Sequence, residues 1–347
     1  MSDPAGDGPA SSRSPDRSEP PERRTGSERR HGPEDKRRML IIVNPYATTV
    51  SDRLKNLVVY ALQGRYEVEA KMTEARDHAT EIGREAVQGG YDVVCAFGGD
   101  GTLNEVANGL AGTDVPVTVL PGGSTNVVCR TLGIPNDVVE ATEHLLQMAD
   151  DFHPRKVDLG LVDDRRFVFS CGVGLDATVV RRVDAHPRLK AQAGEYYYTW
   201  AAVSGFYRHY MRSPVQVRFE TGDHAAEGIT VISQNSDPFT YFGRQPIRVC
   251  DDVDLESATL SCAVLARARQ RDMPTAIARV FTDRLRASAH RQVSHFAGLT
   301  EATVTSISAD GPDGALRPFP VQVDGDYIGE RTQIALGVEP GALTLVS

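Results

Sequence analysis

The sequence predicts an α/β domain with a parallel sheet, followed by a β-rich domain that folds as a sandwich or flattened barrel. From residue 39 to 155, apolar runs of strand length alternate with segments of helical periodicity. That alternation is typical of a parallel sheet with right-handed crossover helices. From residue 156 to 347, short runs with β character recur at close spacing, which favours antiparallel strands.

The first domain is predicted to begin with a buried strand over Met39–Val43, which the turn pair Asn44-Pro45 ends. The pair Gly89-Gly90 is expected to end the second helix, because glycine is the usual residue after a helix. The other predicted elements are a helix near Val50–Leu62, a strand at Tyr66–Met72, that helix from Thr73 to Gln88, a strand at Val93–Phe97, a helix through Leu103–Leu110, a strand at Val115–Leu120, a short helix at Ser124–Leu132 and a helix at Asp137–Met148.

The second domain is predicted to be mostly antiparallel strands. Two segments of helical character are expected to interrupt them, near Gly194–Arg212 and Met273–Ala289. The predicted strands are Val157–Val162, Arg166–Ser170, Val215–Glu220, Gly228–Gln234, Thr259–Ala266, Thr303–Ser308, Val321–Val323, Thr332–Ala335 and Ala342–Val346.

Residues 1–38 differ in composition from the rest of the chain. They contain 6 Pro, 4 Gly and 6 Ser, and no Val, Ile, Leu or aromatic residue. Such a segment cannot bury enough apolar surface to offset the entropy lost on ordering. We expect a disordered tail, and an interaction or phosphorylation arm is the functional alternative.

Composition and charge exclude several classes of protein. The chain of 347 residues has 38 Lys+Arg against 47 Asp+Glu, a net charge of −9, which argues against general nucleic-acid binding. It has no apolar run of membrane-spanning length and no apolar segment typical of a signal peptide. Its 5 Cys form no CxxC pair, which disfavours a disulfide framework or structural zinc. We expect a cytoplasmic protein.

A glycine-rich loop, Gly98-Gly99-Asp100-Gly101-Thr102, lies between a predicted strand and a predicted helix. Ligands of open α/β sheets bind beyond the carboxyl ends of the strands, and a helix N-terminus offers free N–H groups to an anion. The loop therefore predicts a phosphate site, in which Asp100 would hold Mg²⁺ or its water shell. The structural alternative is a tight turn in which Asp100 or Thr102 caps the helix.

Two further segments point to the same site. The loop Pro121-Gly122-Gly123-Ser124-Thr125-Asn126 again follows a strand and precedes a helix, so it is expected at the same edge of the sheet. Far downstream, the segment Val323-Asp324-Gly325-Asp326 places two carboxylates around a glycine, which suits proton abstraction or metal binding. Alone, however, an Asp-Gly pair is more often a hairpin turn.

Other catalytic templates do not match. The sequence has no GxxxxGK[ST] P-loop, no HExxH and no GxSxG motif. The stretch Gly172–Ala177 imitates a dinucleotide-binding fingerprint, but no strand ending in an acidic residue follows at the required distance.

Taken together, these motifs resemble the diacylglycerol kinase catalytic-domain family, which includes sphingosine kinases and bacterial diacylglycerol kinases. The order of the pieces matches that family from about Met39 to the C-terminus. The pieces are Ile42-Val43-Asn44-Pro45, Thr73 with His78-Ala79, GGDGTLNEVANGL (98–110), PGGSTNVVCRTLGIP (121–135), VDLG (157–160), Gly172–Ala177 and VDGD (323–326).

The resemblance implies an NAD kinase/phosphofructokinase-like nucleotide domain and a β-rich lipid-substrate domain, with ATP and Mg²⁺ in the cleft between them. It implies that Asp324 is the general base on a lipid hydroxyl and that Asp100 belongs to the catalytic Mg²⁺ network. Asp326 would be a further metal ligand, where the family usually has Glu. The nucleotide-binding residues that it implies are Asn44, Thr73, Gly98, Gly99, Gly101, Thr102, Gly123, Ser124 and Asn126.

The sequence departs from the family pattern at several positions. Val127 replaces the acidic residue that commonly follows Asn126, and the segment Asp251-Asp252-Val253 lacks the family's glycine, which weakens a metal site at Asp252. The chain also stops 21 residues after Asp326, so a C-terminal segment that returns to the first domain is expected to be missing.

Two segments could face a lipid surface. Glu195–Arg212 carries seven aromatic residues, which suits a membrane interface or, more simply, a helix packed on a sheet. Leu265–Arg291 holds seven Arg against two acidic residues, so it could face anionic lipid or be a solvated helix face.

The function predicted from the sequence is an ATP- and Mg²⁺-dependent lipid kinase, most simply one that converts diacylglycerol to phosphatidic acid in phospholipid biosynthesis. The lipid substrate would be met at a membrane surface, with the protein peripheral on its inner face and no nucleic-acid partner. A kinase for a soluble substrate, similar to NAD kinase, and an inactive lipid- or nucleotide-binding regulator are the alternatives. The oligomeric state, a homo-oligomer included, stays open.

Overall fold

The computed structural model describes residues 36–185, 214–269, 271–282, 285–310 and 314–347, and Lys36–Ser347 form one compact unit. The predicted tail up to residue 35 and the aromatic helix at Gly194–Arg212 lie outside the described residues. The domain boundaries at residues 38 and 155 stay a prediction.

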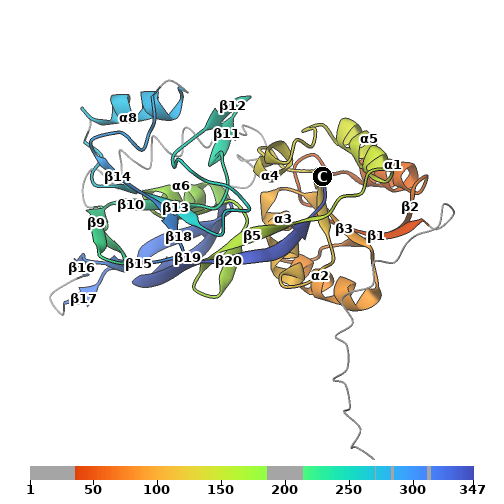
Figure 1. Ribbon diagram of the computed structural model, residues 1–347, viewed down its shortest axis with the longest axis horizontal. Helices are drawn as coiled ribbons and strands as arrows, with labels where there is room; N and C mark the ends of the chain where they lie inside the picture. The colour runs from red at the N-terminus through yellow and green to blue at the C-terminus, as the bar shows by residue number, and fades with distance from the viewer. Residues whose placement is uncertain (1–35, 186–213, 270, 283–284, 311–313) are drawn as a thin grey trace, which may run out of the picture. The chain divides into compact units, whose positions relative to one another are not determined.

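The first half of the chain alternates strands and helices as the sequence predicts (Figure 1). Its strands are β1 (Arg37–Val43), β2 (Tyr66–Met72), β3 (Val93–Gly98) and β4 (Val117–Pro121). Its helices are α1 (Asp52–Leu62), α2 (His78–Gly89), α3 (Asp100–Leu110), α4 (Val127–Thr131) and α5 (Val138–Met148).

Two predicted helices begin later than their sequence pattern suggested. Helix α2 begins at His78 rather than Thr73, because the Thr73 N–H bonds to the Val43 carbonyl oxygen and so continues the strand pairing. Asp77, just before α2, has a φ of +64°, which a helix does not allow. Helix α4 begins at Val127 rather than Ser124, because Asn126 has a φ of +48°.

The strands β1–β4 form a parallel sheet in the order β2-β1-β3-β4. The chain moves one way across the sheet from β1 to β2 and the other way from β2 through β3 to β4. Because crossovers between parallel strands are right-handed, α1 must lie on one face and α2 and α3 on the other. Figure 1 shows this arrangement, with α5 beside α1, and all four strands end at the same edge of the sheet.

The second half of the chain is mostly antiparallel. Helices α6 (Leu175–Asp184) and α8 (Met273–Val280) interrupt its strands. The strands are β5 (Arg155–Val162), β6 (Arg165–Phe167), β7 (Ser170–Gly174), β8 (Val217–Thr221), β9 (His224–Gly228), β10 (Thr230–Gln234), β11 (Thr240–Phe242), β12 (Gln245–Ile247), β13 (Leu260–Leu265), β14 (Val293–Leu299), β15 (Glu301–Ser306), β16 (Ala309–Asp310), β17 (Ala315–Leu316), β18 (Phe319–Val323), β19 (Asp326–Arg331) and β20 (Gln333–Leu345).

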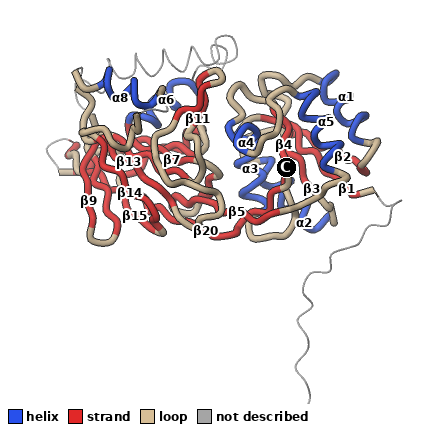
Figure 2. The backbone as a smooth tube through the Cα atoms, turned by 45° about the horizontal axis from the view of Figure 1, so that its top comes forward, coloured by secondary structure: helices blue, strands red, loops and turns tan. Residues whose placement is uncertain are grey.

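Two sheets pack face to face in this half and confirm the predicted sandwich (Figure 2). One has the order β14-β13-β10-β7-β18-β19, and the other contains β20-β15-β8-β9. A single buried cluster takes apolar side chains from both sheets. Phe219 of β8 and Phe296 of β14 stack across the interface with ring centroids 5.1 Å apart.

The last strand corrects an expectation. The C-terminal segment does return to the first half: β20 pairs with β15 and β5, and Leu345 pairs with Val117 of β4. The sequence predicted two separate strands, Thr332–Ala335 and Ala342–Val346, but they belong to one strand, β20, which continues through a bulge between Glu339 and Leu343. The buried Asp158 carboxylate stabilises the bulge by accepting the Gly341 N–H at 2.8 Å and the Ala258 N–H at 2.5 Å.

Because Leu345 is fully buried in the core of the first half, Leu345→Ala should lower the free energy of unfolding by about 2–5 kcal/mol. Urea denaturation measures this change. The control is Leu316→Ala, on a side chain that is 45% exposed, where a change within about 0.5 kcal/mol is expected. Equal losses in the two variants would contradict the placement of β20.

Candidate active site

The predicted site residues of the first half come together because they follow parallel strands. Asn44 follows β1, Thr73 follows β2, Gly99 follows β3 and Gly122 follows β4. The carboxyl ends of parallel strands meet at one edge of a sheet, which is where open α/β sheets bind ligands. Asn44 also donates from Nδ2 to Thr102 Oγ1 at 3.0 Å, which ties the end of β1 to the first turn of α3.

The two glycine-rich loops pack backbone against backbone. The Gly122 N–H donates to the Gly98 carbonyl oxygen at 2.7 Å. A Cβ at Gly122 would lie 2.7 Å from Gly98 Cα, and one at Gly123 would lie 2.9 Å from Gly99 Cα. These distances leave no room for side chains, so the glycines are required by the contact between the loops as well as by any ligand.

Two residues that the resemblance assigned to ligand binding also hold the loops in shape. The Asn126 side chain accepts the Gly123 N–H and donates to the Gly123 carbonyl oxygen, both at 2.9 Å, which closes the second loop. The Asp100 carboxylate accepts the N–H groups of Val127 at 3.0 Å and Val128 at 3.1 Å. Asp100 therefore caps α4 rather than α3, a role that the sequence did not indicate.

The environment of Asp100 favours its neutral form. The pKa of Asp100 is raised to about 6, mainly by burial and to a smaller extent by the negative charge of Asp326. The N–H groups of Val127 and Val128 act in the opposite direction. Asp326 lies close by: a Cβ on Gly101 would be 2.3 Å from Asp326 Oδ2. Two carboxylates at the same loop, one from each half of the chain, suit a divalent cation.

The Asp324-Gly325 pair forms the hairpin turn between β18 and β19. Asp324 has a φ of +47° and Gly325 a φ of +82°, while Val323 pairs with Asp326 across the turn. Left-handed conformations at both central residues define a type I′ turn, for which Asp-Gly is a preferred sequence. The structural interpretation of this motif is therefore correct, and the turn also lies at the candidate site.

The Asp324 carboxylate is buried and accepts four hydrogen bonds. Oδ1 accepts the N–H groups of Phe169 at 2.9 Å and Ser170 at 3.0 Å. Oδ2 accepts the Val168 N–H at 2.7 Å and Asn104 Nδ2 at 2.8 Å. The pKa of Asp324 is raised to about 6, because the effect of burial exceeds the opposing effect of these four donors.

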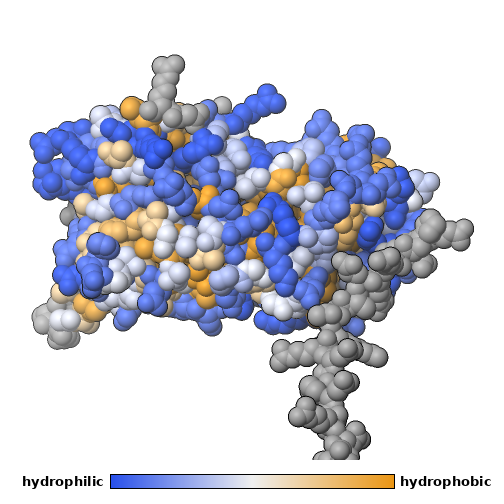
Figure 3. All heavy atoms as spheres, viewed as in Figure 1, coloured by the Kyte–Doolittle hydropathy of each residue, from blue (hydrophilic) through white to orange (hydrophobic). Residues whose placement is uncertain are grey.

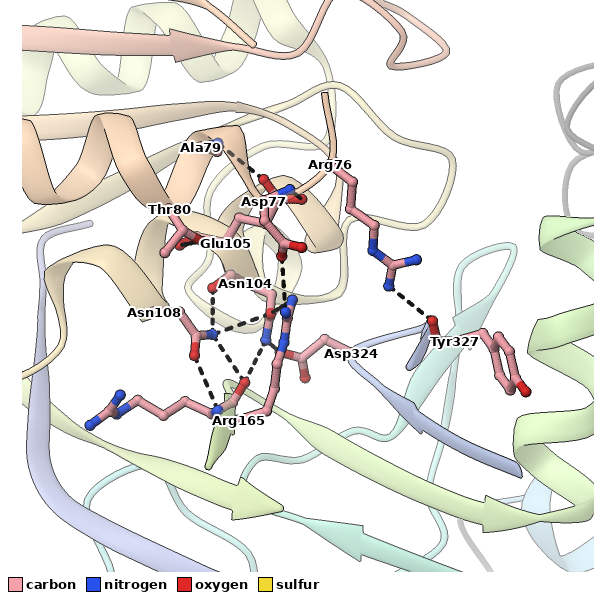
Figure 4. A network of polar contacts seen from close by, with 11 residues as sticks. Arg76, Asp77, Ala79, Thr80, Asn104, Glu105, Asn108, Arg165, Asp324 and Tyr327 are labelled. Atoms are coloured by element: carbon pink, nitrogen blue, oxygen red, sulfur yellow. Dashed lines mark hydrogen bonds and ion pairs between the residues drawn. The ribbon is translucent and has the colours of Figure 1, made fainter. Parts of the chain in front are cut away.

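Asn104 and Arg165 belong to the site but were missed as site residues (Figure 4). Asn104 is 1% exposed and donates from Nδ2 to the Arg166 carbonyl oxygen at 2.9 Å as well as to Asp324. Arg165 donates to Asn104 Oδ1 at 2.9 Å and forms an ion pair with Asp77 at 3.0 Å. Asn104 was visible within the GGDGTLNEV segment, but nothing in the sequence showed that it would meet Asp324, 220 positions away.

A cavity of about 830 Å³ is lined by residues from both halves of the chain. One wall comes from the ends of the parallel strands and includes Asn44, Thr73, Gly99, Asp100, Gly101, Thr102, Gly123, Ser124 and Asn126. A second wall is largely apolar and includes Phe169, Val179, Val180, Phe239, Tyr241, Phe242, Ile247 and Phe281. Asp324 and Asp326 also line it, as does a basic residue, Arg76, that the sequence analysis did not single out.

Two predicted residues do not line this cavity. Gly98 ends β3, where a Cβ would lie 2.4 Å from Thr102 Oγ1, so it supports the loop. Asp252, the weak metal candidate, is not among the lining residues and has a φ of +55°. Among the described residues, no three His, Cys, Asp or Glu side chains are grouped as a metal site.

Part of this site lies in a segment that matches a known family model. Residues 38–162 match the family model of the diacylglycerol kinase catalytic domain. This segment of the chain is similar to that catalytic domain. The family that the sequence resembled is thereby confirmed for this segment, which contains both glycine-rich loops.

Diacylglycerol kinases also appear among the similar proteins and solved structures. The chain is 32% identical over 201 residues to a diacylglycerol kinase of Staphylococcus epidermidis, and equally so to one of Staphylococcus aureus. These matches cover 56% of this chain and 60% of each relative. A putative diacylglycerol kinase structure from Bacillus anthracis has the same fold, with a TM-score of 0.69 at 23% identity over 89% of this chain and 96% of that chain.

Hydrophilic residues prevail on the face seen in Figure 3, where apolar residues form small separate patches. None of the helices within the described ranges is both long enough and apolar enough to cross a membrane.

The cavity contains a further carboxylate with a perturbed pKa. Asp176 of α6 accepts a hydrogen bond from Gln322 Nε2 at 2.8 Å, and burial raises its pKa to about 6. Because the unfolded value is near 3.9, the protonated form of Asp176 stabilises the fold below about pH 4, and this stabilisation is lost as the pH rises through 6.

We therefore expect Asp176→Asn to weaken the pH dependence of stability. The variant should gain stability relative to the wild type as the pH rises from 5 to 7, as measured by urea denaturation. Asp114→Asn, on a side chain that is 86% exposed, controls for the loss of one negative charge. Parallel stability curves for Asp176→Asn and the wild type would show that the Asp176 carboxyl is not destabilised by burial.

Proposed function

We propose that this chain is an ATP- and Mg²⁺-dependent kinase that phosphorylates a lipid hydroxyl, most simply that of diacylglycerol. The observation that carries the proposal is the pairing of two unlike walls in one cavity. Glycine-rich loops that suit phosphate and a group of aromatic and aliphatic side chains line the same cavity. A phosphate donor and an amphiphilic acceptor need these two environments side by side.

The polar wall suits a polyphosphate. Gly99, Gly101 and Gly123 of the two loops line the cavity, and α3 begins there, at Asp100, so the free N–H groups of its first turn lie at this edge. Ser124 and Thr125 line the cavity and can add hydroxyl donors. Arg76, whose Nη2 donates to the Tyr327 carbonyl oxygen at 2.9 Å, places a positive charge at the same cavity.

The donor set fits Mg²⁺ brought in with a nucleotide. Mg²⁺ prefers oxygen ligands and is usually held by one or two carboxylates together with water and substrate phosphates. Asp100 and Asp326 supply two carboxylates at the phosphate wall. When bound, Mg²⁺ would neutralise charge on the phosphoryl group during transfer.

The chain's own contribution to the chemistry is mainly positioning. In the transfer, the lipid hydroxyl oxygen bonds to the γ-phosphorus, the bond from that phosphorus to the β-phosphate oxygen breaks, and ADP leaves. The hydroxyl proton passes to a carboxylate of the Asp324–Asp326 turn. A loose transition state needs the reactants in line and the charge neutralised more than it needs a strong base.

The test is transfer of labelled γ-phosphate from ATP into an extracted lipid pool by the purified full chain with Mg²⁺. We expect a labelled phospholipid with the wild type and none with Asp326→Asn, and chromatography of the product would identify the acceptor. Label in the water-soluble fraction instead would indicate a soluble acceptor. ATP binding without turnover would indicate a regulator, and either result would overturn the lipid-kinase proposal.

We further propose that the apolar end of the cavity meets a membrane surface near α8. Phe281 lines the cavity and packs edge-on against Phe242 with ring centroids 5.7 Å apart, yet its side chain is 44% exposed. Ile277 and Leu285, four positions before and after it, are each 49% exposed. Exposed arginines lie on either side of these three apolar residues in the sequence, and their positive charge complements anionic lipid. They are Arg267, Arg269, Arg271 and Arg286.

If this face meets lipid, a double variant Ile277→Asp, Leu285→Asp should bind vesicles containing phosphatidylglycerol about tenfold more weakly, because two carboxylates replace apolar anchors. Cosedimentation without ATP measures this binding. Val139→Asp, on α5 and 68% exposed, is the matched control and should bind like the wild type. Unchanged binding of the double variant would exclude this face.

A further inference from the structure

Arg76 is the one basic residue among the described residues that line the cavity. Carboxylates are numerous in the same cavity, and they are Asp100, Glu105, Asp176, Asp324 and Asp326. A polyphosphate would bring further negative charge to this place, so its binding requires positive charge beyond that of one Mg²⁺ ion. Arg76 is placed to supply that charge from the chain itself.

The charge of Arg76 is not neutralised by a carboxylate. Within the ranges that the structure describes, Arg76 forms no ion pair, whereas Arg165 pairs with Asp77 at 3.0 Å. Its hydrogen-bond partner is a neutral group, the Tyr327 carbonyl oxygen, which Nη2 reaches at 2.9 Å. A guanidinium group carries five N–H donors in a fixed planar fork. This one bond therefore directs the side chain and leaves its positive charge for an anionic ligand.

The chain holds the backbone on both sides of Arg76. After it, the Asp77 N–H donates to Glu105 Oε1 at 2.9 Å, and the Asp77 carboxylate pairs with Arg165 (Figure 4). Before it, the Thr73 N–H bonds to the end of β1 at 2.9 Å. The loop between β2 and α2 is thus fixed at both ends, so its arginine is held near the cavity before any ligand arrives.

Arg76 reaches the part of the cavity where the two halves of the chain meet. Figure 4 shows its guanidinium group directed at Tyr327, which follows Asp326 in β19. The Asp326 carboxylate in turn lies against Gly101 of the first glycine-rich loop. If the two loops hold the phosphates of a nucleotide, the last phosphate would meet the acceptor beside this hairpin, within reach of Arg76.

We infer that Arg76 contacts the phosphoryl group that is transferred and stabilises its charge during the reaction. The inference rests on the proposed function and adds a catalytic residue to it. As the lipid hydroxyl oxygen bonds to the γ-phosphorus and the bond to the β-phosphate oxygen breaks, negative charge spreads over three oxygens of the phosphoryl group. The planar guanidinium group can donate parallel N–H bonds to two of them. Arg76 forms no covalent bond and moves no proton, since the hydroxyl proton passes to a carboxylate of the hairpin turn.

The test compares two nucleotides, ADP and the unreactive ATP analogue adenylyl imidodiphosphate, of which only the analogue carries a γ-phosphoryl group. Calorimetric titration of the full chain with Mg²⁺ gives both dissociation constants. Arg76→Ala should weaken binding of the analogue by about tenfold or more and change that of ADP by less than about twofold. Arg76→Lys should restore part of the loss, because it keeps the charge but not the planar fork. Arg84→Ala, which removes an exposed arginine of α2, is the matched control and should bind both nucleotides like the wild type.

Two further measurements separate catalysis from stability. Arg76→Ala should lower kcat by about 100-fold or more. Its midpoint of thermal unfolding should stay within about 2 °C of the wild type, because the Arg76 side chain is exposed. Equal weakening of both nucleotides, no weakening of either, or an unchanged kcat would overturn the inference and leave the proposed function in place. A wild-type chain that binds neither nucleotide would overturn the proposed function and the inference together.

Discussion

The buried carboxylate of Asp324 needs hydrogen-bond donors where the two halves of the chain meet. Much of the geometry of the site follows from which donors the chain supplies. Leaving such a charge without partners would cost several kcal/mol, so the chain must bring donors to it. It does so with three backbone N–H groups of residues 168–170 and the amide of Asn104. The hairpin, the start of β7 and helix α3 are thereby fixed relative to one another, and the cavity lies between them.

A second buried aspartate, Asp158, also accepts backbone N–H groups, and it lies beside β20, the strand that joins the two halves of the chain. Asp158 accepts N–H groups from Gly341 and Ala258, and its own N–H bonds to the Leu255 carbonyl oxygen at 2.6 Å. This satisfies the irregular backbone of β20 at the point where the strand leaves the sandwich for the parallel sheet. Asp158 of VDLG and Asp324 of VDGD thus hold backbone geometry, although an Asp in a short motif of this kind suggests a metal or a base.

Periodicity predicted most of the fold, because buried strands and amphipathic helices leave a local pattern in the sequence. It failed where the deciding partner is distant. Leu345 looked like the end of a short strand, and only its pairing with Val117 places it in the first half. The candidate site shows the same limit. The glycine-rich loops could be predicted because each directly follows a strand. The contact of Asn104 with Asp324 could not, because the two residues are 220 positions apart and no local pattern shows that their segments meet.

The Asp324-Gly325 motif can be interpreted as a hairpin turn or as part of a ligand site, and the two interpretations are compatible because they concern different atoms of the same turn. The Asp-Gly pair is a type I′ hairpin turn because both residues adopt positive φ. The first carboxylate of the hairpin accepts four hydrogen bonds, which hold the turn in place. A side chain on a rigid turn loses little entropy when it meets a ligand, so the same contacts that satisfy Asp324 would also prepare this turn to bind one.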